Sequence, residues 1–312
     1  MLEGLWRSSE NGDRPKQGVR VLMRVVLTGG SGDLGQILCP MLVQRGDVPV
    51  VLDVRPPHNR AEFVDASITD RKALAEALPG ADMVIHIAAW HGVHEFRKEK
   101  DVYEFWDLNV TGTFNVFQAA ADAAIDKVIF ISSTSIDERF GVYGHTKVLC
   151  EEIVRAYVAR HGMSIVTLRP RAFIPHWNRT IYSSYIEWAN WFWGGAVHID
   201  DVAQAVMRGV DYLASGQKTQ EPLFLPVDGA YEYTDDDLKA WDKEGAGSTF
   251  KKYYSNYIDL ANEHGLDPAR KPKRLDISET RRILKYEPRF SLKNLLEELA
   301  EHGAKGPPAP VP

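Results

Sequence analysis

The feature that most constrains this chain is a set of evenly spaced glycines that directly follows a short apolar run. The run VVLTG occupies residues 25–29, and Gly29, Gly32 and Gly35 stand three residues apart. An apolar stretch with helical character follows at 34–46. Glycine permits a tight turn and a close backbone approach, and the start of a helix offers unpaired N–H groups. The order of strand, glycine turn and helix predicts a site for a dinucleotide pyrophosphate.

Apolar runs and helical stretches alternate along the chain up to Pro170. The strand-like runs lie at 25–29, 48–54, 81–89, 127–133 and 164–170, and the helical stretches lie at 34–46, 70–78, 101–124 and 143–161. Strands separated by helices form parallel sheets that are covered on both faces. The pattern predicts an α/β fold with a doubly wound, Rossmann-like parallel sheet.

The alternation stops after Pro170, which predicts a second, smaller unit. We expect a dinucleotide-binding domain over 23–170, to which 196–215 returns, and a discontinuous C-terminal substrate lobe made of 171–195 and 216–302. The four tryptophans between Trp177 and Trp193 are interpreted as core residues of that lobe, because aromatic clusters more often fill a core than bind a ligand.

Both ends of the chain lack the patterns of packed structure. Residues 1–22 have no apolar periodicity, and 303–312 are rich in glycine and proline. Proline lacks a backbone donor and has a fixed φ angle, so it suits neither helix nor sheet. We therefore expect a disordered leader and a disordered tail.

Charge and cysteine content exclude several classes of partner. Lys and Arg number 37 and Asp and Glu number 43, which gives a formal net charge of −6. A negative protein repels a phosphate backbone and an anionic membrane, so we expect neither nucleic acid nor a membrane as partner. The two cysteines have no metal-ligand spacing, so no metal site is predicted. Few cysteines and the absence of a signal-like apolar stretch favour a cytoplasmic location.

Asp53 ends the second predicted strand, 18 residues after Gly35. At that offset a carboxylate bonds the ribose hydroxyls of the adenosine, and it opposes a 2′-phosphate. Arg55 could pair with such a phosphate, but the carboxylate would remain beside it. We therefore expect NAD rather than NADP; the alternative is that Asp53 is only a solvated strand end.

Tyr143 and Lys147 are four residues apart and share a helix face. A phenol has a pKa of about 10, and a nearby ammonium favours the phenolate that a base near neutral pH requires. This spacing alone usually means a solvated helical pair. Here, however, the cluster Ser132-Ser133-Thr134-Ser135 ends the preceding strand, where ligands bind in parallel sheets. A hydroxyl from this cluster could hold a substrate oxygen beside the phenol.

The motifs TGGSGDLG, VIHIAA, NVTGT, ISSTS, YGHTK, LRP and VHIDDVA occur in the order of the extended short-chain dehydrogenase/reductase family. The chain resembles its NAD-dependent epimerase/dehydratase type over about residues 24–300. The resemblance implies Tyr143 as acid/base, Lys147 as its partner and ribose ligand, Ser133 as the hydroxyl and Asn109 as a supporting group. The resulting catalytic set is Ser133, Tyr143, Lys147 and Asn109. The cofactor contacts are Gly29, Gly32, Asp33, Leu34, Gly35, Asp53, Asp65, Ala66, Ala88, Ala89, Tyr143, Lys147 and Pro170. Substrate contacts are Thr134, His91, His94 and Arg171.

Two departures from the family pattern bear on the substrate. Thr134-Ser135 stands where dehydratases carry an Asp-Glu pair directly after the catalytic hydroxyl residue, which disfavours dehydration. Only 22 residues separate Pro175 from His198, where a nucleotide-recognition segment is usually longer. These features favour a smaller sugar or sugar acid over a full nucleotide-sugar.

The sequence thus predicts an NAD-dependent oxidoreductase or epimerase that acts by hydride transfer at a secondary alcohol or carbonyl of a sugar-like substrate. The alternative is a non-catalytic dinucleotide-binding sensor or scaffold, since a fold alone does not establish a function. By resemblance we also expect a homodimer that pairs through the helices at 101–124 and 143–161.

Overall fold

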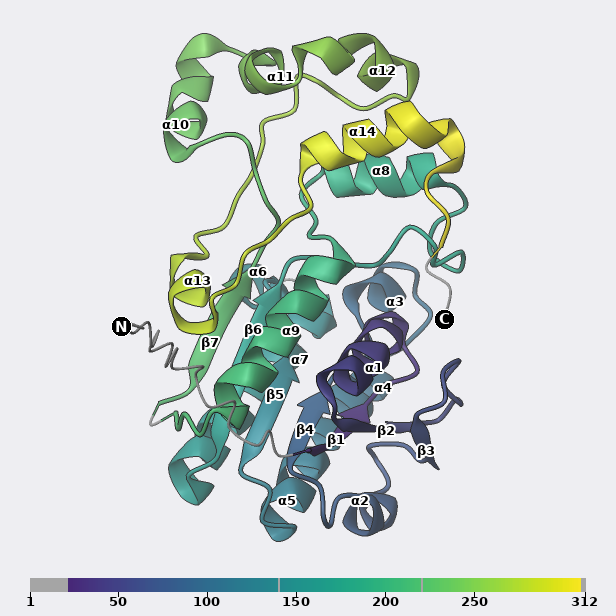
Figure 1. Ribbon diagram of the computed structural model, residues 1–312, viewed down its shortest axis with the longest axis vertical. Helices are drawn as coiled ribbons and strands as arrows, with labels where there is room; N and C mark the ends of the chain where they lie inside the picture. The colour runs from purple at the N-terminus through teal and green to yellow at the C-terminus, as the bar shows by residue number, and fades with distance from the viewer. Residues whose placement is uncertain (1–21, 140, 220, 310–312) are drawn as a thin grey trace, which may run out of the picture.

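A computed structural model describes residues 22–309, apart from residues 140 and 220. Its centre is a parallel sheet with strand order β3-β2-β1-β4-β5-β6-β7 (Figure 1). The strands are β1 (Arg24–Thr28), β2 (Val48–Asp53), β3 (Glu62–Asp65), β4 (Met83–His86), β5 (Lys127–Ile131), β6 (Ser164–Pro170) and β7 (Leu223–Val227). The chain leaves β1 for β2 on one side and later returns to add β4 on the other. The predicted doubly wound, Rossmann-like sheet is confirmed, and its topological switch point lies between β1 and β4.

Helices cover both faces of the sheet because both faces of each central strand are apolar. One face carries α1 (Asp33–Arg45), α9 (Ile199–Ala214) and α13 (Ser278–Leu284), and the other carries α2 (Arg71–Ala77), α5 (Thr113–Asp122) and α7 (Gly141–His161). Leu38 and Val206 belong to the first apolar layer, and Val116 and Val154 belong to the second; all four are fully enclosed.

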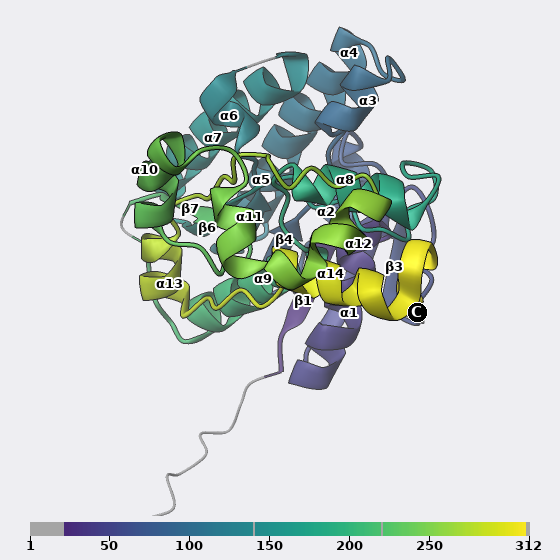
Figure 2. The ribbon, with the colours of Figure 1, turned by 90° about the horizontal axis from the view of Figure 1, so that it is seen from above.

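A helical lobe lies beyond the carboxyl ends of the strands (Figure 1). It contains α8 (Tyr185–Trp193), α10 (Asp235–Glu244), α11 (Ser248–Tyr253), α12 (Ile258–Glu263) and α14 (Leu292–His302). Seen from above, α11, α12 and α14 lie over the sheet (Figure 2). The lobe has its own apolar core, which includes Trp188 and Phe192 of α8 and Leu295 and Leu299 of α14. The interpretation of the tryptophans as core residues therefore holds for Trp188 and Trp193.

The predicted lobe range 216–302 needs correction, because it contains two elements of the sheet domain. β7 pairs with β6, and α13 packs against β7 and α9. The run LFLPV that forms β7 holds Pro226, which argues against a central strand. A proline is tolerated here because β7 is an edge strand. The short β3 was also missed.

The predicted helix at 101–124 is interrupted in the structure. It divides into α4 (Val102–Phe105), a π-helical segment η1 (Trp106–Gly112) and α5. Such wide turns interrupt α-helices mostly at functional positions. The remaining short elements are α3 (Gly92–Phe96), α6 (Ser135–Glu138), and the 3-10 turns η2 (Ser255–Tyr257) and η3 (Gly303–Lys305).

The predicted disordered ends lie partly outside the described residues, which omit 1–21 and 310–312. Residues 303–309 differ from the expectation, because they pack on the lobe. The carbonyl of Pro307 accepts a hydrogen bond from His176 Nε2 at 3.2 Å, and Gly306 lies directly against the Tyr185 ring. Beyond the 3-10 turn η3, the proline-rich tail is therefore ordered by docking on the lobe.

Over residues 22–309, leaving out 140 and 220, no helix is long and apolar enough to cross a membrane. Within the same residues, no group of three or more His, Cys, Asp or Glu side chains is arranged to hold a metal ion. Cys39 and Cys150 are both buried free thiols.

Candidate active site

The glycine turn after β1 is shaped by backbone contacts that leave no room for side chains. Gly29 has a φ of +72°, and a Cβ there would lie 2.7 Å from the Cα of Ala88. A Cβ on Gly35 would lie 2.2 Å from the carbonyl oxygen of Gly30. Gly32 is the N-cap of α1 and provides no side chain to cap it. The turn therefore has the bare cradle and the open helix N-terminus that a pyrophosphate requires, with Asp33 and Leu34 starting the helix.

The predicted adenosine contacts gather beside this turn at the ends of β2 and β3. The Asp53 carboxylate accepts hydrogen bonds from the backbone N–H of Ser31 at 3.1 Å and of Arg55 at 3.2 Å. Asp53 and Asp65 are register partners in the sheet, and the N–H of Ala66 donates to the carbonyl of Asp53. Asp53 is thus fixed next to the phosphate turn and is more than a solvated strand end.

The remaining predicted cofactor contacts lie at the ends of β4 and β6. The N–H of Ala88 donates to the Thr28 carbonyl at 3.0 Å, and Ala88 and Ala89 are both partly exposed. Pro170 ends β6, and its carbonyl accepts from the N–H of Thr134 at 3.2 Å. These positions all lie at the carboxyl edge of the sheet, where ligands of such folds bind.

Ser133, Tyr143 and Lys147 meet after β5, as the sequence predicts. The hydroxyl of Ser133 is hydrogen-bonded to the Tyr143 phenol. The Lys147 ammonium lies 6.0 Å from the centre of the Tyr143 ring and donates to the Ile131 carbonyl at 2.8 Å. Ser133 also bonds the N–H and the hydroxyl of Ser135, which fixes its position at the start of α6. The three groups can hold one substrate oxygen between a hydroxyl and a phenol, with a cation behind the phenol.

Burial works against ionisation of both groups on α7. It raises the pKa of the Tyr143 phenol to about 12, although the hydrogen bond from Ser133 lowers it. Burial likewise lowers the pKa of the Lys147 ammonium, while Cys150 and Glu151 raise it. A further cation close to the phenol would favour its ionised form. The site is therefore arranged so that a bound cationic group can change the protonation of Tyr143.

Asn109 connects the segment after β4 to the helix that carries the tyrosine. It is almost fully buried in η1 and bonds both the N–H and the carbonyl of Trp90, at 2.8 and 3.0 Å. Its amide also donates to the Thr146 hydroxyl, which in turn donates to the Tyr143 carbonyl at 2.8 Å. The structure thus gives Asn109 a supporting position. The role of Thr146 was missed, although it stands between Tyr143 and Lys147 in the same motif.

A buried ion pair lies beneath the site and was not predicted. Glu151, one turn after Lys147, accepts two hydrogen bonds from Arg169, at 2.9 and 2.6 Å, and one from the Ser132 hydroxyl at 2.6 Å. Glu151 is buried and Arg169 is partly exposed. The pair joins α7 to β5 and β6 directly below the catalytic side chains. Its signal in the sequence was only the helical spacing of Glu151 from Lys147.

The residues predicted to contact substrate have different surroundings. His91 and His94 form a capping box at the start of α3, with the N–H of His91 donating to His94 Nδ1 at 3.1 Å. Thr134 is the N-cap of α6. Arg171 donates from one nitrogen to Asp228, to the Tyr231 hydroxyl and to a backbone carbonyl. Arg171 is therefore engaged in holding the lobe.

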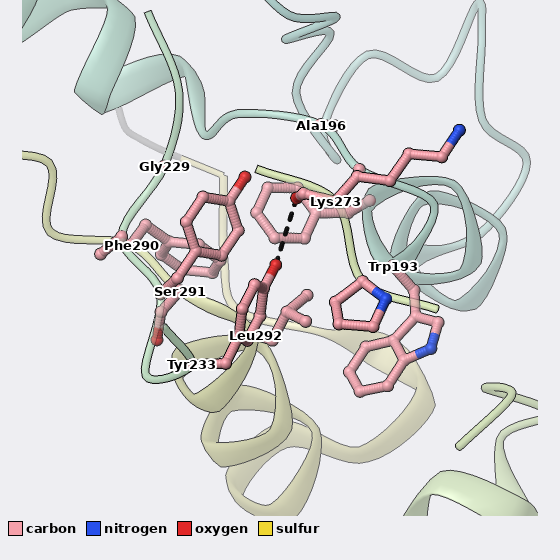
Figure 3. Close-up of a pocket in the computed structure, with 13 residues that line it drawn as sticks. Trp193, Ala196, Gly229, Tyr233, Lys273, Phe290, Ser291 and Leu292 are labelled. Carbon is pink, nitrogen blue, oxygen red and sulfur yellow. Dashed lines mark hydrogen bonds between the residues drawn. The ribbon is translucent and has the colours of Figure 1, made fainter. Parts of the chain in front are cut away.

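The lobe contains a hollow (Figure 3), and Arg171 reaches its edge through hydrogen bonds to Tyr231 and to the Lys273 carbonyl. The hollow is lined by the end of α8, the segment after β7, the segment before α13 and the start of α14. Tyr233, Lys273 and Trp193 are among its lining residues, and the Tyr233 hydroxyl donates to the Lys273 carbonyl (Figure 3). None of the predicted catalytic residues lines it.

Comparison with known proteins identifies relatives that match part of this chain. UDP-glucose 4-epimerase of Rhizobium meliloti is 33% identical over 169 residues, which cover 46% of this chain and 50% of the relative. Uronate dehydrogenase of Pseudomonas putida is 25% identical over 209 residues, covering 60% of this chain and 71% of the relative. The chain spans about half to two thirds of the length of several curated relatives that it matches.

A solved structure of UDP-galactose 4-epimerase superposes with a TM-score of 0.65 at 20% identity, covering 89% of this chain and 99% of that one. At this identity the likeness shows a common fold. A model of the NAD dependent epimerase/dehydratase family matches residues 25–180, which is half of the chain. The resemblance drawn from the motifs is confirmed: the chain belongs to the NAD dependent epimerase/dehydratase family, whose cofactor is NAD.

Proposed function

We propose that this protein is an NAD-dependent oxidoreductase or epimerase that acts by hydride transfer at a secondary alcohol or carbonyl of a sugar-like substrate. The observation that carries the proposal is the meeting of Ser133, Tyr143 and Lys147 at the carboxyl end of β5. This meeting place adjoins the topological switch point, where the glycine cradle provides a cofactor site of the kind that this family requires.

Each side chain has a definite task in this proposal. Ser133 holds the substrate oxygen, and Tyr143 takes the hydroxyl proton during oxidation and returns a proton during reduction. Lys147 stabilises the phenolate and binds the cofactor ribose, while the Ile131 carbonyl fixes its ammonium. Bound NAD supplies the hydride acceptor. Gly29, Gly32 and Gly35, with Asp33 and Leu34, hold its pyrophosphate, and Asp53 bonds its adenosine ribose.

The proposed substrate is a sugar, a sugar acid or a related small carbinol that binds between the sheet domain and the lobe. Two relatives act, by their names, on UDP-glucose and on uronates, which favours a carbohydrate. The short segment between Pro175 and His198 favours the smaller of these classes. We assign no dehydratase activity, because Ser135 stands where a dehydratase carries an acidic residue.

The experiment is a screen of free sugars, uronates and nucleotide-sugars with NAD, read by NADH absorbance and by product stereochemistry. A dehydrogenase accumulates NADH, whereas an epimerase inverts a carbon without net NADH. Tyr143→Phe is the matched control protein in this screen, because the substitution removes the phenol oxygen and keeps the ring. A substrate turned over equally by both proteins would contradict the assignment of Tyr143.

The alternative of a non-catalytic sensor has less support. A sensor needs the glycine cradle but has no use for a buried ammonium beside a phenol. Enclosing an ammonium is costly unless it is compensated, and Lys147 is kept buried by a hydrogen bond to the chain. If no substrate emerges and neither Tyr143→Phe nor Lys147→Met changes any activity, the sensor becomes the better proposal.

We further propose a cytoplasmic homodimer that pairs through α4, η1, α5 and α7. Exposed apolar side chains on these elements support it, namely Tyr103, Trp106, Phe114 and Leu149. Contiguous exposed apolar surface is typical of association sites. Light scattering at micromolar concentration should give about twice the chain mass of 35.1 kDa, and a monomer mass would contradict the dimer.

A further inference from the structure

The first turn of α7 is held by a carboxylate from another element. The two oxygens of Glu95, on α3, accept hydrogen bonds from the backbone N–H of Val142 at 2.7 Å and of Tyr143 at 2.9 Å. The first N–H groups of a helix have no partner within the helix, and a negative charge there is favoured by the helix dipole. Glu95 therefore bonds the very residue that carries the proposed catalytic phenol.

Two glycines make this contact possible. Gly141 has a φ of +68°, and a Cβ there would lie 2.5 Å from Glu95 Oε1. Gly92, at the start of α3, lies against the Tyr143 ring, since a Cβ there would be 3.3 Å from its Cδ1. α3 thus contacts Tyr143 twice, at its backbone through Glu95 and at its ring through Gly92.

The other end of α3 is anchored to the segment that leads into the lobe. Arg97 donates to the carbonyls of Thr180 and Ile181 at 2.7 and 2.6 Å. Two residues before Thr180, the Asn178 amide donates to the Asp33 carboxylate at the start of α1, at 2.7 Å. A continuous set of hydrogen bonds therefore connects the glycine turn, the segment before α8, α3 and the first turn of α7.

We propose that Glu95 is a positioning residue: it fixes the first turn of α7 so that the Tyr143 hydroxyl stays beside Ser133, with Arg97 anchoring α3 against the lobe. The proposal rests on the proposed function, in which Tyr143 is the acid/base. Glu95 itself need not touch substrate, since it acts through two backbone N–H groups. Small errors in the placement of a catalytic group are costly in rate, so the effect should appear in turnover.

Two variants separate shape from charge. Glu95→Gln keeps the length but has one acceptor oxygen, so one of the two N–H groups loses its partner. Glu95→Asp keeps both acceptors and the charge but is one methylene shorter. Asp70→Asn is the control for loss of charge alone at a helix start, because one oxygen of Asp70 accepts both backbone N–H groups, those of Lys72 and Ala73 on α2, and the amide keeps that oxygen.

For both Glu95 variants we expect kcat to fall by about tenfold or more, with the KM for NAD within about twofold of the parent. Asp70→Asn should leave both constants unchanged. Adding Glu95→Gln to Tyr143→Phe should cause no further loss, because the two changes then act through one group. An unchanged kcat in Glu95→Gln, or an equal loss in both backgrounds, would overturn the proposal.

A second readout does not depend on turnover. Difference absorbance of phenolate, taken between each protein and its Tyr143→Phe counterpart, isolates the titration of Tyr143. Both Glu95 variants should ionise Tyr143 at lower pH than the parent, because a displaced phenol loses burial, which raises its pKa to about 12 and outweighs the lowering by the Ser133 hydrogen bond. If Tyr143→Phe keeps full turnover, the proposed function fails and this titration alone decides on Glu95. A parent-like titration in Glu95→Asp would mean that charge rather than position matters, and would overturn the proposal.

Discussion

The sheet domain and the lobe use their buried polar groups differently. At the carboxyl edge of the sheet, Ser133, Tyr143 and Lys147 come from two successive elements and point to one place. Where the sheet meets the lobe, buried polar groups join segments that are distant in the sequence. Asp228 bonds Arg171, 57 residues before it, and the N–H of Leu275, 47 residues after it.

The two regions differ in how far apart in the sequence their interacting residues lie. In the sheet domain, strand ends lie side by side, so residues that follow different strands meet without further contacts to guide them. In the lobe, the apolar core of α8, α11 and α14 determines the packing, and the polar contacts follow from it. The chemistry of the first region is therefore readable in motifs, whereas that of the second region is not.

The largest expected effect tests whether the chemistry lies in the sheet domain. Tyr143→Phe should lower kcat by about 10²- to 10⁴-fold, the usual contribution of a general acid/base, and leave the affinity for NAD unchanged. Lys147→Met should lower both, because the ammonium serves the phenol and the ribose. Steady-state kinetics and calorimetric titration of NAD measure the two effects. A loss of NAD affinity in Tyr143→Phe would contradict the expectation that this change affects catalysis and not cofactor binding.

The same contrast explains what the sequence could predict. The order and type of most central elements followed from strand periodicity, whereas the choice of Ser133 as the partner of Tyr143 followed from the resemblance to the family. β7 was missed because it contains Pro226, and within a sheet a proline is tolerated mainly in an edge strand. Glu95 was missed because its partners are backbone N–H groups 47 and 48 residues away, which no spacing encodes. The engagement of Arg171 with Asp228 was missed with β7, because the two residues directly follow the paired strands β6 and β7.

The second prediction addresses the junction between the sheet and the lobe. Asp228 is fully buried and pairs with Arg171 at 3.3 Å. Asp228→Asn should lower the free energy of unfolding by about 3 kcal/mol, because it leaves a buried guanidinium without its counter-charge. Urea denaturation measures this loss, and Asp235→Asn, at an exposed pair with Arg274, is the control with a change below about 0.5 kcal/mol. A change in Asp228→Asn no larger than the control's would remove the distinction between the regions.

The third prediction concerns pH and involves both regions. Burial lowers the pKa of His86, within the sheet domain, to about 3, and that of His176 and His198, at the lobe, to about 4. The unfolded chain titrates near 6.5, so it binds more protons than the folded chain between these values. Stability is thus complete above about pH 6.5 and falls as the pH drops toward 4.

At pH 5 each buried histidine should cost about 1–2 kcal/mol relative to pH 7. Asp201 opposes them in part. Burial raises its pKa to about 6, so its protonation in the folded state recovers about 1 kcal/mol as the pH falls. Urea denaturation at pH 7 and 5 gives the net loss, and His198→Gln should reduce it. A stability that rises from pH 7 to 5 would contradict the assignment.

The smallest expected effect concerns cofactor choice, which should belong to the sheet domain alone. The Asp53 carboxylate is fixed by the N–H groups of Ser31 and Arg55 beside the glycine turn, so a 2′-phosphate would meet a negative charge there. We expect NAD to bind at least about ten times more tightly than NADP, which corresponds to about 1.4 kcal/mol. Calorimetric titration of both cofactors provides the ratio. Asp53→Asn should reduce the ratio of NAD affinity to NADP affinity. Asp228→Asn should leave this ratio unchanged, because Asp228 lies between β7 and the lobe and takes no part in the choice of cofactor. Equal affinities in the parent would show that Arg55 compensates for the carboxylate, and a ratio that changes in Asp228→Asn would show that the two regions are coupled in cofactor binding.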